Sequence, residues 1–254
     1  MGFFASSGIL NRRGFFSAPV STAPPAFSPT DISGLKLWLK ADAGVTMDGA
    51  NNVTSWADQS GNNISFNGSA YILNNEINSK PAIYFDGDDS QNYLTCQDQG
   101  LLNGLTGLSF FFTWKVYNND SNKGLFGSSN YDAVEIVSNP LAQIRIRNQN
   151  YDASFLYEND WFDIDNNYSI SSFVAENGDG NAYKNASIVD GTFGENIELP
   201  IADDVTFELG RYAYPNYDLY AKVKIAEFII YGKKLNLTEL GQVHNYLNER
   251  YAIY

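Results

Sequence analysis

The sequence predicts an all-β fold: a two-sheet antiparallel sandwich with one C-terminal helix and an extended N-terminal arm. Short runs rich in aromatic and β-branched residues recur between clusters of Asn, Asp and Gly, and no alternating strand–helix series interrupts them. The chain has 254 residues with 17 Phe, 17 Tyr and 4 Trp, enough apolar material to fill the core of one such domain.

The predicted strands are short and separated by turn residues. The segment 108–117 is the longest, and 81–86 is entered through a proline. The Asn/Asp/Gly run 176–181 lies between two of these segments and predicts a β-hairpin. The predicted strands cover 35–39, 81–86, 108–117, 144–147, 168–175, 182–186, 205–210 and 224–231.

Strong helix signals are confined to the C-terminal segment. Asn236 is a candidate N-cap with Glu239 at the capping-box spacing, and Leu235 and Leu240 occupy the hydrophobic-staple positions. The apolar residues that recur at helical spacing are Leu240, Val243, Leu247 and Tyr251. We therefore expect a closing helix at about 236–251 that buries one apolar stripe against the sandwich.

Residues 1–30 differ from the rest of the chain. Their only charged residues are Arg12 and Arg13, and a Pro-Pro pair at 24–25 favours an extended path. A segment of this composition cannot form its own core, so 1–30 is predicted to be an arm and 31–254 the sandwich domain. Two interpretations stay open: a disordered tail, or an anchoring arm that docks its aromatic side chains on a neighbouring subunit. The docking side chains would be Phe3, Phe4, Phe15 and Phe16.

Composition limits the partners. The formal net charge is −13, which argues against binding to nucleic acid or to an anionic membrane, because both require Lys and Arg. A glycan or another protein chain is compatible with this negative charge.

Cys96 is the only cysteine and is expected to be buried and inert. No run approaches the ~18 apolar residues of a membrane span, and the start is not a usual signal peptide.

Few residues support catalysis. His244 is the only histidine, and we expect it to be partly exposed on the closing helix, so no Ser-His-Asp triad or His-rich metal site is predicted. Glycoside hydrolysis needs two carboxylates. Asp163 and Asp165 have a suitable spacing but lie in a loop-like stretch, and Glu227 stands alone inside a strand. We therefore predict no enzymatic activity.

Two oxygen-rich loops are candidates for calcium, which takes six to eight oxygen ligands. Neither loop follows EF-hand spacing, and Asp and Asn also bond their own backbone in turns. The turn interpretation is preferred, and no cofactor is predicted. The calcium candidates are Asp86, Asp88, Asp89 and Asp179.

The most patterned loop is 56–61. Either Trp56 faces a sugar, or Asp58 and Ser60 pin a turn before Gly61, and the turn is favoured because its polar residues explain it fully. Glycan contact is expected instead from loop aromatics, since Tyr offers a flat apolar face with a polar tip. The candidates are Tyr212, Tyr214, Tyr217 and Trp161, with Tyr151 and Tyr157.

Several of these segments resemble one known family. The runs 38–44, 53–61, 80–87, 225–231 and 235–251, in this order, are similar to the concanavalin A-like, laminin-G-type domains of phage virion proteins and secreted bacterial proteins. The resemblance covers 31–254 and implies a two-sheet jelly roll with the closing helix beside the sheets. It fixes no function, because this fold hosts glycan binders, hydrolases and structural modules.

The arm also looks like the attachment segments of phage structural proteins. The resemblance thus implies a non-enzymatic virion protein: a capsid decoration, a head fibre or a tail-associated module. Expected partners are other virion proteins, such as capsid or fibre subunits, and a host-surface glycan, with the chain forming a homo-oligomer. The alternatives are a bacterial carbohydrate-binding module and, less favoured, a glycoside hydrolase.

Overall fold

A computed structural model describes residues 26–88, 92–96, 101–102, 104–117, 123–128, 134–139, 141–146, 154–156, 167–176, 179–189, 206–214 and 217–254. In chain order its elements are η1 (Pro29–Asp31), β1 (Leu35–Lys40), β2 (Val45–Met47), β3 (Asn52–Ala57), β4 (Ser65–Ile77), β5 (Lys80–Asp86), β6 (Leu94–Cys96), β7 (Gly107–Val116), β8 (Lys123–Ser128), β9 (Val134–Asn139), β10 (Leu141–Ile146), β11 (Ser154–Leu156), β12 (Ser169–Glu176), β13 (Asp179–Lys184), β14 (Ser187–Val189), β15 (Phe207–Leu209), β16 (Arg211–Tyr214), β17 (Tyr217–Tyr220), β18 (Lys222–Tyr231) and α1 (Leu237–Tyr251).

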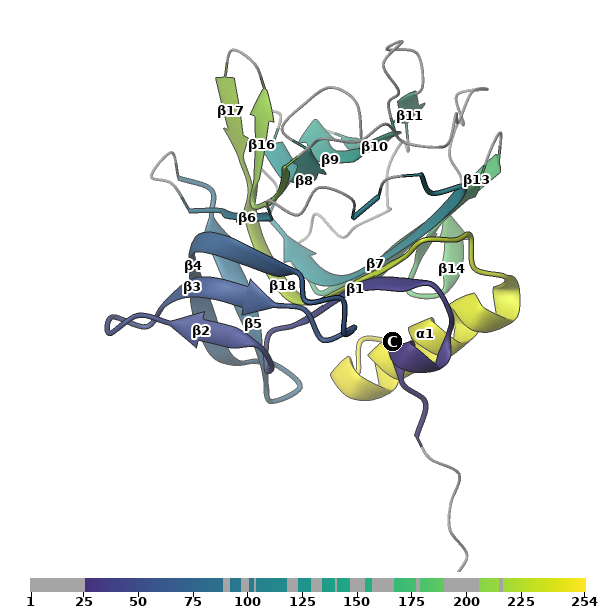
Figure 1. Ribbon diagram of the computed structural model, residues 1–254, viewed down its shortest axis with the longest axis horizontal. Helices are drawn as coiled ribbons and strands as arrows, with labels where there is room; N and C mark the ends of the chain where they lie inside the picture. The colour runs from purple at the N-terminus through teal and green to yellow at the C-terminus, as the bar shows by residue number, and fades with distance from the viewer. Residues whose placement is uncertain are drawn as a thin grey trace, which may run out of the picture.

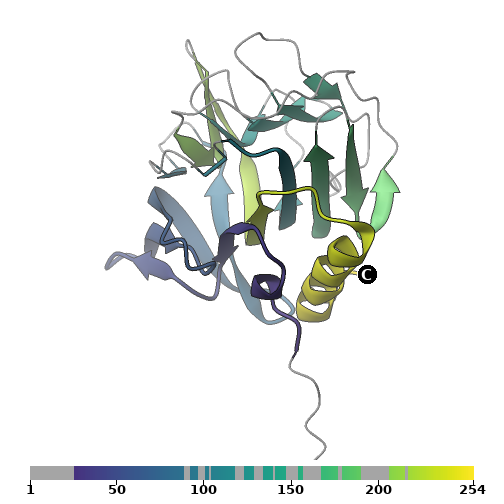
Figure 2. The same cartoon turned by 45° about the vertical axis from the view of Figure 1, so that its right-hand side comes forward.

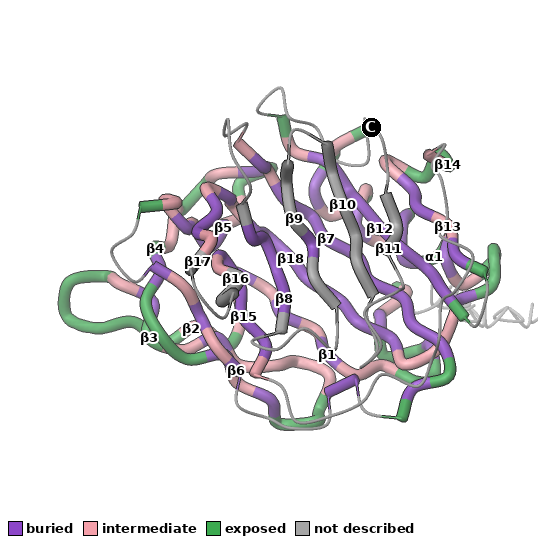
Figure 3. The backbone as a smooth tube through the Cα atoms, turned by 90° about the horizontal axis from the view of Figure 1, so that it is seen from above, coloured by how far each residue is buried: buried purple, intermediate pink, exposed green. Residues whose placement is uncertain are grey.

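The strands form two facing antiparallel layers, as the sequence predicts. One layer runs β4-β5-β18-β7-β12-β13-β14, with β1 paired to the far end of β18. The hydrogen-bonded order continues from β4 through β6, β15, β8, β9 and β10 to β11, and this part lies across β7 and β18 (Figures 1 and 3). The described part of the chain is thus a β-sandwich with β18 and β7 at its centre.

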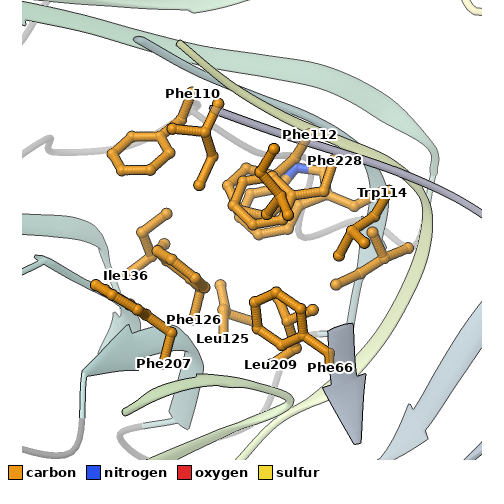
Figure 4. Packing of buried hydrophobic residues seen from close by; sticks show 14 of the residues in the cluster. Phe66, Phe110, Phe112, Trp114, Leu125, Phe126, Ile136, Phe207, Leu209 and Phe228 are labelled. Atoms are coloured by element: carbon orange, nitrogen blue, oxygen red, sulfur yellow. The ribbon is translucent and has the colours of Figure 1, made fainter. Parts of the chain in front are cut away.

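The space between the two layers is filled by aromatic side chains. Phe112 stacks on Trp114 at 4.4 Å and on Phe228 at 4.0 Å between ring centroids, while Phe126 meets Phe228 edge to face at 5.1 Å. These four side chains are fully buried (Figure 4). Each buried aromatic contributes about 2 kcal/mol or more through apolar burial, so this cluster dominates the stability of the sandwich.

Helix α1 covers the outer face of the β18-β7-β12 layer (Figures 1 and 2). The predicted cap is confirmed: the Asn236 side chain accepts from the Thr238 and Glu239 backbone, and the Glu239 side chain accepts from Asn236 N–H at 3.2 Å. The predicted stripe is also confirmed, because Leu240, Val243, Leu247 and Tyr251 are all buried in a second apolar cluster under the helix. No helix in the described part of the chain is long and apolar enough to cross a membrane.

The predicted partial exposure of His244 is wrong. Its side chain is 1 % exposed, its Nε2 lies 2.8 Å from Ser172 Oγ, and its ring meets Phe111 edge to face at 5.5 Å. The reason is helical spacing, because position 244 lies four residues after Leu240 and three before Leu247, inside the buried stripe. Burial lowers the pKa of His244 to about 4.

Every segment predicted to be a strand is a strand in β1, β5, β7, β10, β12, β13, β15 or β18, with ends shifted by a few residues. The polar strand β4 escapes prediction because much of its length is exposed and carries Asn and Gly. The pairing of Arg211–Tyr214 with Tyr217–Tyr220 makes a two-stranded antiparallel ladder where the sequence predicts a loop. It begins after Gly210, whose φ of +81° and close approach to Phe85 leave no room for a side chain.

His244 predicts a loss of stability in acid. Its pKa is 6.5 when unfolded and about 4 in the fold, so between these values the unfolded state binds more protons. Stability present above pH 6.5 is therefore lost as the pH falls towards 4, by about 3 kcal/mol. His244→Gln keeps a polar group for Ser172 but does not titrate, so urea unfolding should show a smaller difference between pH 7 and pH 4.5. An equal difference in both proteins would contradict the assignment.

Candidate binding groove

A groove of about 640 Å³ lies between α1, the turn joining β4 to β5, and the chain just before η1. One wall of the groove is formed by the face of α1 that does not carry the buried apolar stripe. The residues that line the groove are Ala26, Phe27, Asn78, Lys80, Gln242, Asn245, Tyr246, Glu249 and Arg250. The helix thus has two functional faces, one that anchors it to the sheet and one that shapes the groove.

Tyr246 forms the aromatic wall of the groove and is held on three sides. Its ring meets Phe27 edge to face at 6.2 Å and Trp38 at 6.3 Å between centroids. Its hydroxyl donates to Glu227 Oε1 at 2.9 Å. A ring fixed in this way loses little freedom when a ligand binds, so the groove is preorganised.

Glu227 is the anchor behind this wall. A β-bulge between Ile225 and Glu227 turns its carboxylate to the outer face of β18, under the helix. The carboxylate is fully buried, also accepts from Trp38 Nε1 at 2.6 Å and Tyr251 OH at 2.7 Å, and forms an ion pair with Arg250, whose Nε lies 3.1 Å from Oε2. Burial raises the pKa of Glu227, while these donors and the Arg250 charge oppose that rise.

Arg250 closes one end of the groove. Its Nη2 donates to Asp42, which lies outside β1, and its backbone carbonyl accepts from Asn78 Nδ2 at 2.9 Å. The guanidinium is therefore shared between the buried Glu227 and the surface Asp42. These bonds tie the C-terminal end of α1 to the segment that follows β1 and to the turn between β4 and β5.

The rim of the groove carries polar groups that are available to a ligand. The side chains of Gln242, Asn245, Lys80 and Glu249 have no hydrogen-bond or ion-pair partner among the described residues. They offer two amides, one cation and one anion around the Tyr246 ring. Among the described residues, the lining contains no histidine, cysteine or paired carboxylates.

The predicted site residues fall in different places. The side chains of Phe3, Phe4, Phe15, Phe16 and Trp161 lie outside the described residues, as do Tyr151, Tyr157, Asp163 and Asp165. Tyr212, Tyr214 and Tyr217 belong to the β16–β17 hairpin, where the backbone alone is described. The structure therefore brings none of the described candidates to the groove.

The calcium candidates are not gathered into one site. Asp86 Oδ1 accepts from Asp88 N–H at 3.1 Å, which is a turn interaction, and Asp89 lies outside the described residues. Asp179 pairs with Lys234. Among the residues that the structure describes, no group of three or more His, Cys, Asp or Glu side chains is placed to hold a metal ion.

The turn interpretation of 56–61 is confirmed, and presentation of Trp56 to a sugar is excluded. Trp56 is fully buried at the end of β3, and its Nε1 donates to the Lys40 carbonyl at 2.8 Å. Asp58 Oδ1 accepts from Ser60 N–H and from Trp38 N–H, both at 2.8 Å. The loop thus pins β1 beside the groove.

The groove itself is a feature that the sequence analysis missed. Gln242, Asn245, Tyr246, Glu249 and Arg250 recur at helical spacing opposite the apolar stripe. An aromatic residue and an arginine within that otherwise polar stripe are the signal that would have identified it. Tyr246 in particular stands where a purely solvated helix face would carry a smaller or charged residue.

Neither a protein-family model nor a curated protein matches the chain, but solved structures match its fold. The binding domain of botulinum neurotoxin DC, in complex with rat synaptotagmin II, aligns over 87 % of this chain and 52 % of its own at 15 % identity, with a TM-score of 0.64. The binding domain of Paraclostridial Mosquitocidal Protein 1 aligns over 86 % and 53 % at 14 % identity, with a TM-score of 0.67.

A structure of botulinum neurotoxin type C, from work on its interaction with two ganglioside molecules in cell entry, aligns over 86 % of this chain and 52 % of its own. The identity is 15 % and the TM-score 0.65. The chain therefore spans about half the length of each neighbour. The likeness establishes the β-sandwich fold.

Replacing Glu227 tests the anchor of the groove. Glu227→Gln places an amide N–H₂ where the carboxylate now accepts three hydrogen bonds, so a donor faces donors, and Arg250 loses its buried charged partner. We expect about 3 kcal/mol lower unfolding free energy in urea, with a changed near-ultraviolet circular dichroism signal from the Trp38–Tyr246 pair. The control Glu249→Gln, exposed on the same helix, should change the free energy by at most about 0.5 kcal/mol. Similar losses in both variants would contradict this role.

Proposed function

We propose that this chain is a non-catalytic, glycan-binding β-sandwich and that the groove beside α1 holds the sugar. The observation that carries the proposal is the fixed Tyr246 ring placed beside the unpartnered amides of Gln242 and Asn245. A sugar presents apolar C–H faces and a rim of hydroxyl groups. An aromatic ring can pack against the C–H faces, and amides, which both donate and accept hydrogen bonds, can bind the hydroxyl groups.

The size and chemistry of the groove support the same proposal. Its volume of about 640 Å³ lies within the range of small-molecule sites, and its lining combines a few convergent polar groups with an apolar wall. Lys80 and Glu249 place one charge of each sign on the rim, so the groove itself favours a neutral ligand. This agrees with the glycan partner expected from composition.

The fold neighbours support binding over catalysis. They include receptor-binding and binding domains, one of them in complex with SialylT, and botulinum neurotoxin type C enters cells by interaction with two ganglioside molecules. These are properties of proteins about twice as long as the matching region. For this chain they favour a carbohydrate ligand, and they leave the choice of surface to its own residues.

The proposal extends to a virion. The aromatic, nearly uncharged composition of the N-terminal segment and the resemblance to phage domains support display on a particle, as a capsid decoration, head fibre or tail-associated module. The described end of that segment packs on the domain: Phe27 contacts Tyr246, and the Pro29 carbonyl accepts from Tyr231 OH at 2.9 Å. Anchoring is therefore assigned to residues 1–25, ahead of these contacts.

Glycan binding is tested with the amides of the groove. A glycan array first identifies a ligand for the full chain, and calorimetry then compares variants. Gln242→Ala with Asn245→Ala should weaken binding about tenfold or more, because two hydrogen bonds to sugar hydroxyls are lost. Thr238→Ala, exposed on the same helix outside the groove, should bind like the parent. A parent chain with no glycan ligand, or a double variant with unchanged affinity, would refute the proposal.

Anchoring is tested by deletion of residues 1–25. Because Phe27 and Pro29 remain, the truncated chain should keep its thermal unfolding temperature within a few degrees. Its incorporation into particles, measured by co-sedimentation, should be lost. Replacing Phe3, Phe4, Phe15 and Phe16 together with Ser should have the same effect if their rings form the contact. Normal incorporation of the truncated chain into particles would contradict anchoring by residues 1–25.

A further inference from the structure

A second surface lies on the outer face of the sheet, beyond the part that α1 covers. The strand register aligns Tyr71 on β4 with Tyr84 on β5, Tyr84 with Lys224 on β18, and Lys224 with Lys115 on β7. These four side chains form one row across four neighbouring strands. A second row brings Lys222 beside Tyr117, whose N–H donates to the Lys222 carbonyl at 3.1 Å. We call these six residues the lysine–tyrosine face.

Three ammonium groups converge on one ring in this face. The Nζ atoms of Lys115 and Lys222 lie 5.2 Å and 5.1 Å from the Tyr117 ring centroid, and that of Lys224 lies 5.8 Å from it. Lys224 is neutralised by Glu76, with 2.6 Å between Nζ and Oε1. Lys115 and Lys222 have no ion-pair partner among the described residues. Asp86 on β5 is aligned with Lys222, so the three lysines, Glu76 and Asp86 together leave an excess of one positive charge on this face.

This arrangement is electrostatically incomplete. Two unpaired ammonium groups beside the same ring repel each other, and the attraction of a tyrosine ring for a cation offsets only part of that repulsion. The formal net charge of the whole chain is −13, so a local excess of positive charge is not the result of a generally basic composition. An anion seated between Lys115 and Lys222 would complete the site.

The tyrosines of the first row indicate what carries the anion. Tyr71 is 41 % exposed, and its ring lies 6.2 Å from that of Tyr84 in a tilted pair. Neighbouring strands are ~4.8 Å apart, so Tyr84 and Lys115, two strands apart, are separated by about 10 Å. A ligand that touches both the Tyr71–Tyr84 pair and Lys115 must extend beyond one sugar ring.

We propose that the lysine–tyrosine face binds an acidic oligosaccharide, with the carboxylate of one sugar between Lys115 and Lys222 and a neighbouring sugar against Tyr71 and Tyr84. This site is separate from the groove and takes a different ligand class, a charged one. A long polyanion such as nucleic acid is disfavoured, because it would extend from this patch onto an acidic surface. A single carboxylate meets only the local lysines, since screening limits more distant charges to about 8 Å.

The test uses the full chain and an array of matched saccharide pairs. Each pair has a sialic acid or glucuronic acid saccharide and the same saccharide with its carboxyl group reduced to an alcohol. The parent chain should bind at least one carboxylated member about tenfold more tightly than its reduced partner. Lys115→Gln with Lys222→Gln should bring that preference below about twofold, and Tyr71→Ala should weaken both members.

The controls separate this site from others. Lys36→Gln, on β1 beside the opposite end of β18, should keep the preference, and so should the Gln242→Ala, Asn245→Ala variant of the groove. All changed lysines and Tyr71 are at least partly exposed, so thermal unfolding should match the parent. Equal binding of carboxylated and reduced forms, no binding of any carboxylated saccharide, or a preference that survives the double lysine change would overturn the proposal. Tighter, lysine-dependent binding of heparin or single-stranded DNA would overturn the assigned ligand class.

Discussion

The buried carboxylate of Glu227 is the interaction on which the rest of this molecule depends. A charge without water is tolerated in a fold only when partners replace that water, and here three hydrogen-bond donors and the paired Arg250 guanidinium do so. One of these partners is Trp38 on β1, and three come from α1. Glu227 therefore links β18 both to its neighbouring strand β1 and to the helix.

The contacts with Glu227 fix the orientation of α1, which apolar burial alone cannot do. The stripe from Leu240 to Tyr251 drives the helix onto the sheet, but hydrophobic attraction has no direction and would permit the helix to rotate or slide. The hydrogen bonds of Tyr246 and Tyr251 and the ion pair of Arg250 with one fixed carboxylate require these three side chains to meet at one place. The helix consequently has one orientation, and the groove on its other face has a defined shape.

The sequence predicts the parts of this fold that local patterns control. The strands that become β7 and β18 are long and apolar, and the capping box at Asn236 and Glu239 is read directly from spacing. The groove depends on contacts between distant positions: Trp38 and Glu227 are 189 residues apart in the chain. The burial of His244, by contrast, follows from its helical spacing between Leu240 and Leu247, whereas its contacts with Ser172 and Phe111 join positions far apart in the chain and cannot be read from local spacing.

The packing of the core and the position of α1 determine which surfaces of the sandwich a ligand can reach. The space between the two layers is packed with aromatic rings, so an ordinary sandwich core leaves no room for a ligand there. On the outer face, α1 covers the strands around Ala82 and Ala226, and Tyr84 and Lys224, each two residues away on the same strand, lie beyond it. The alternation of side chains along a strand then places the outward residues that lie beyond the helix on one accessible surface. The helix thus divides the outer face into a groove with balanced charges along its own flank and a lysine-rich surface beyond it, and this difference in charge is the basis for proposing a different class of ligand for each region.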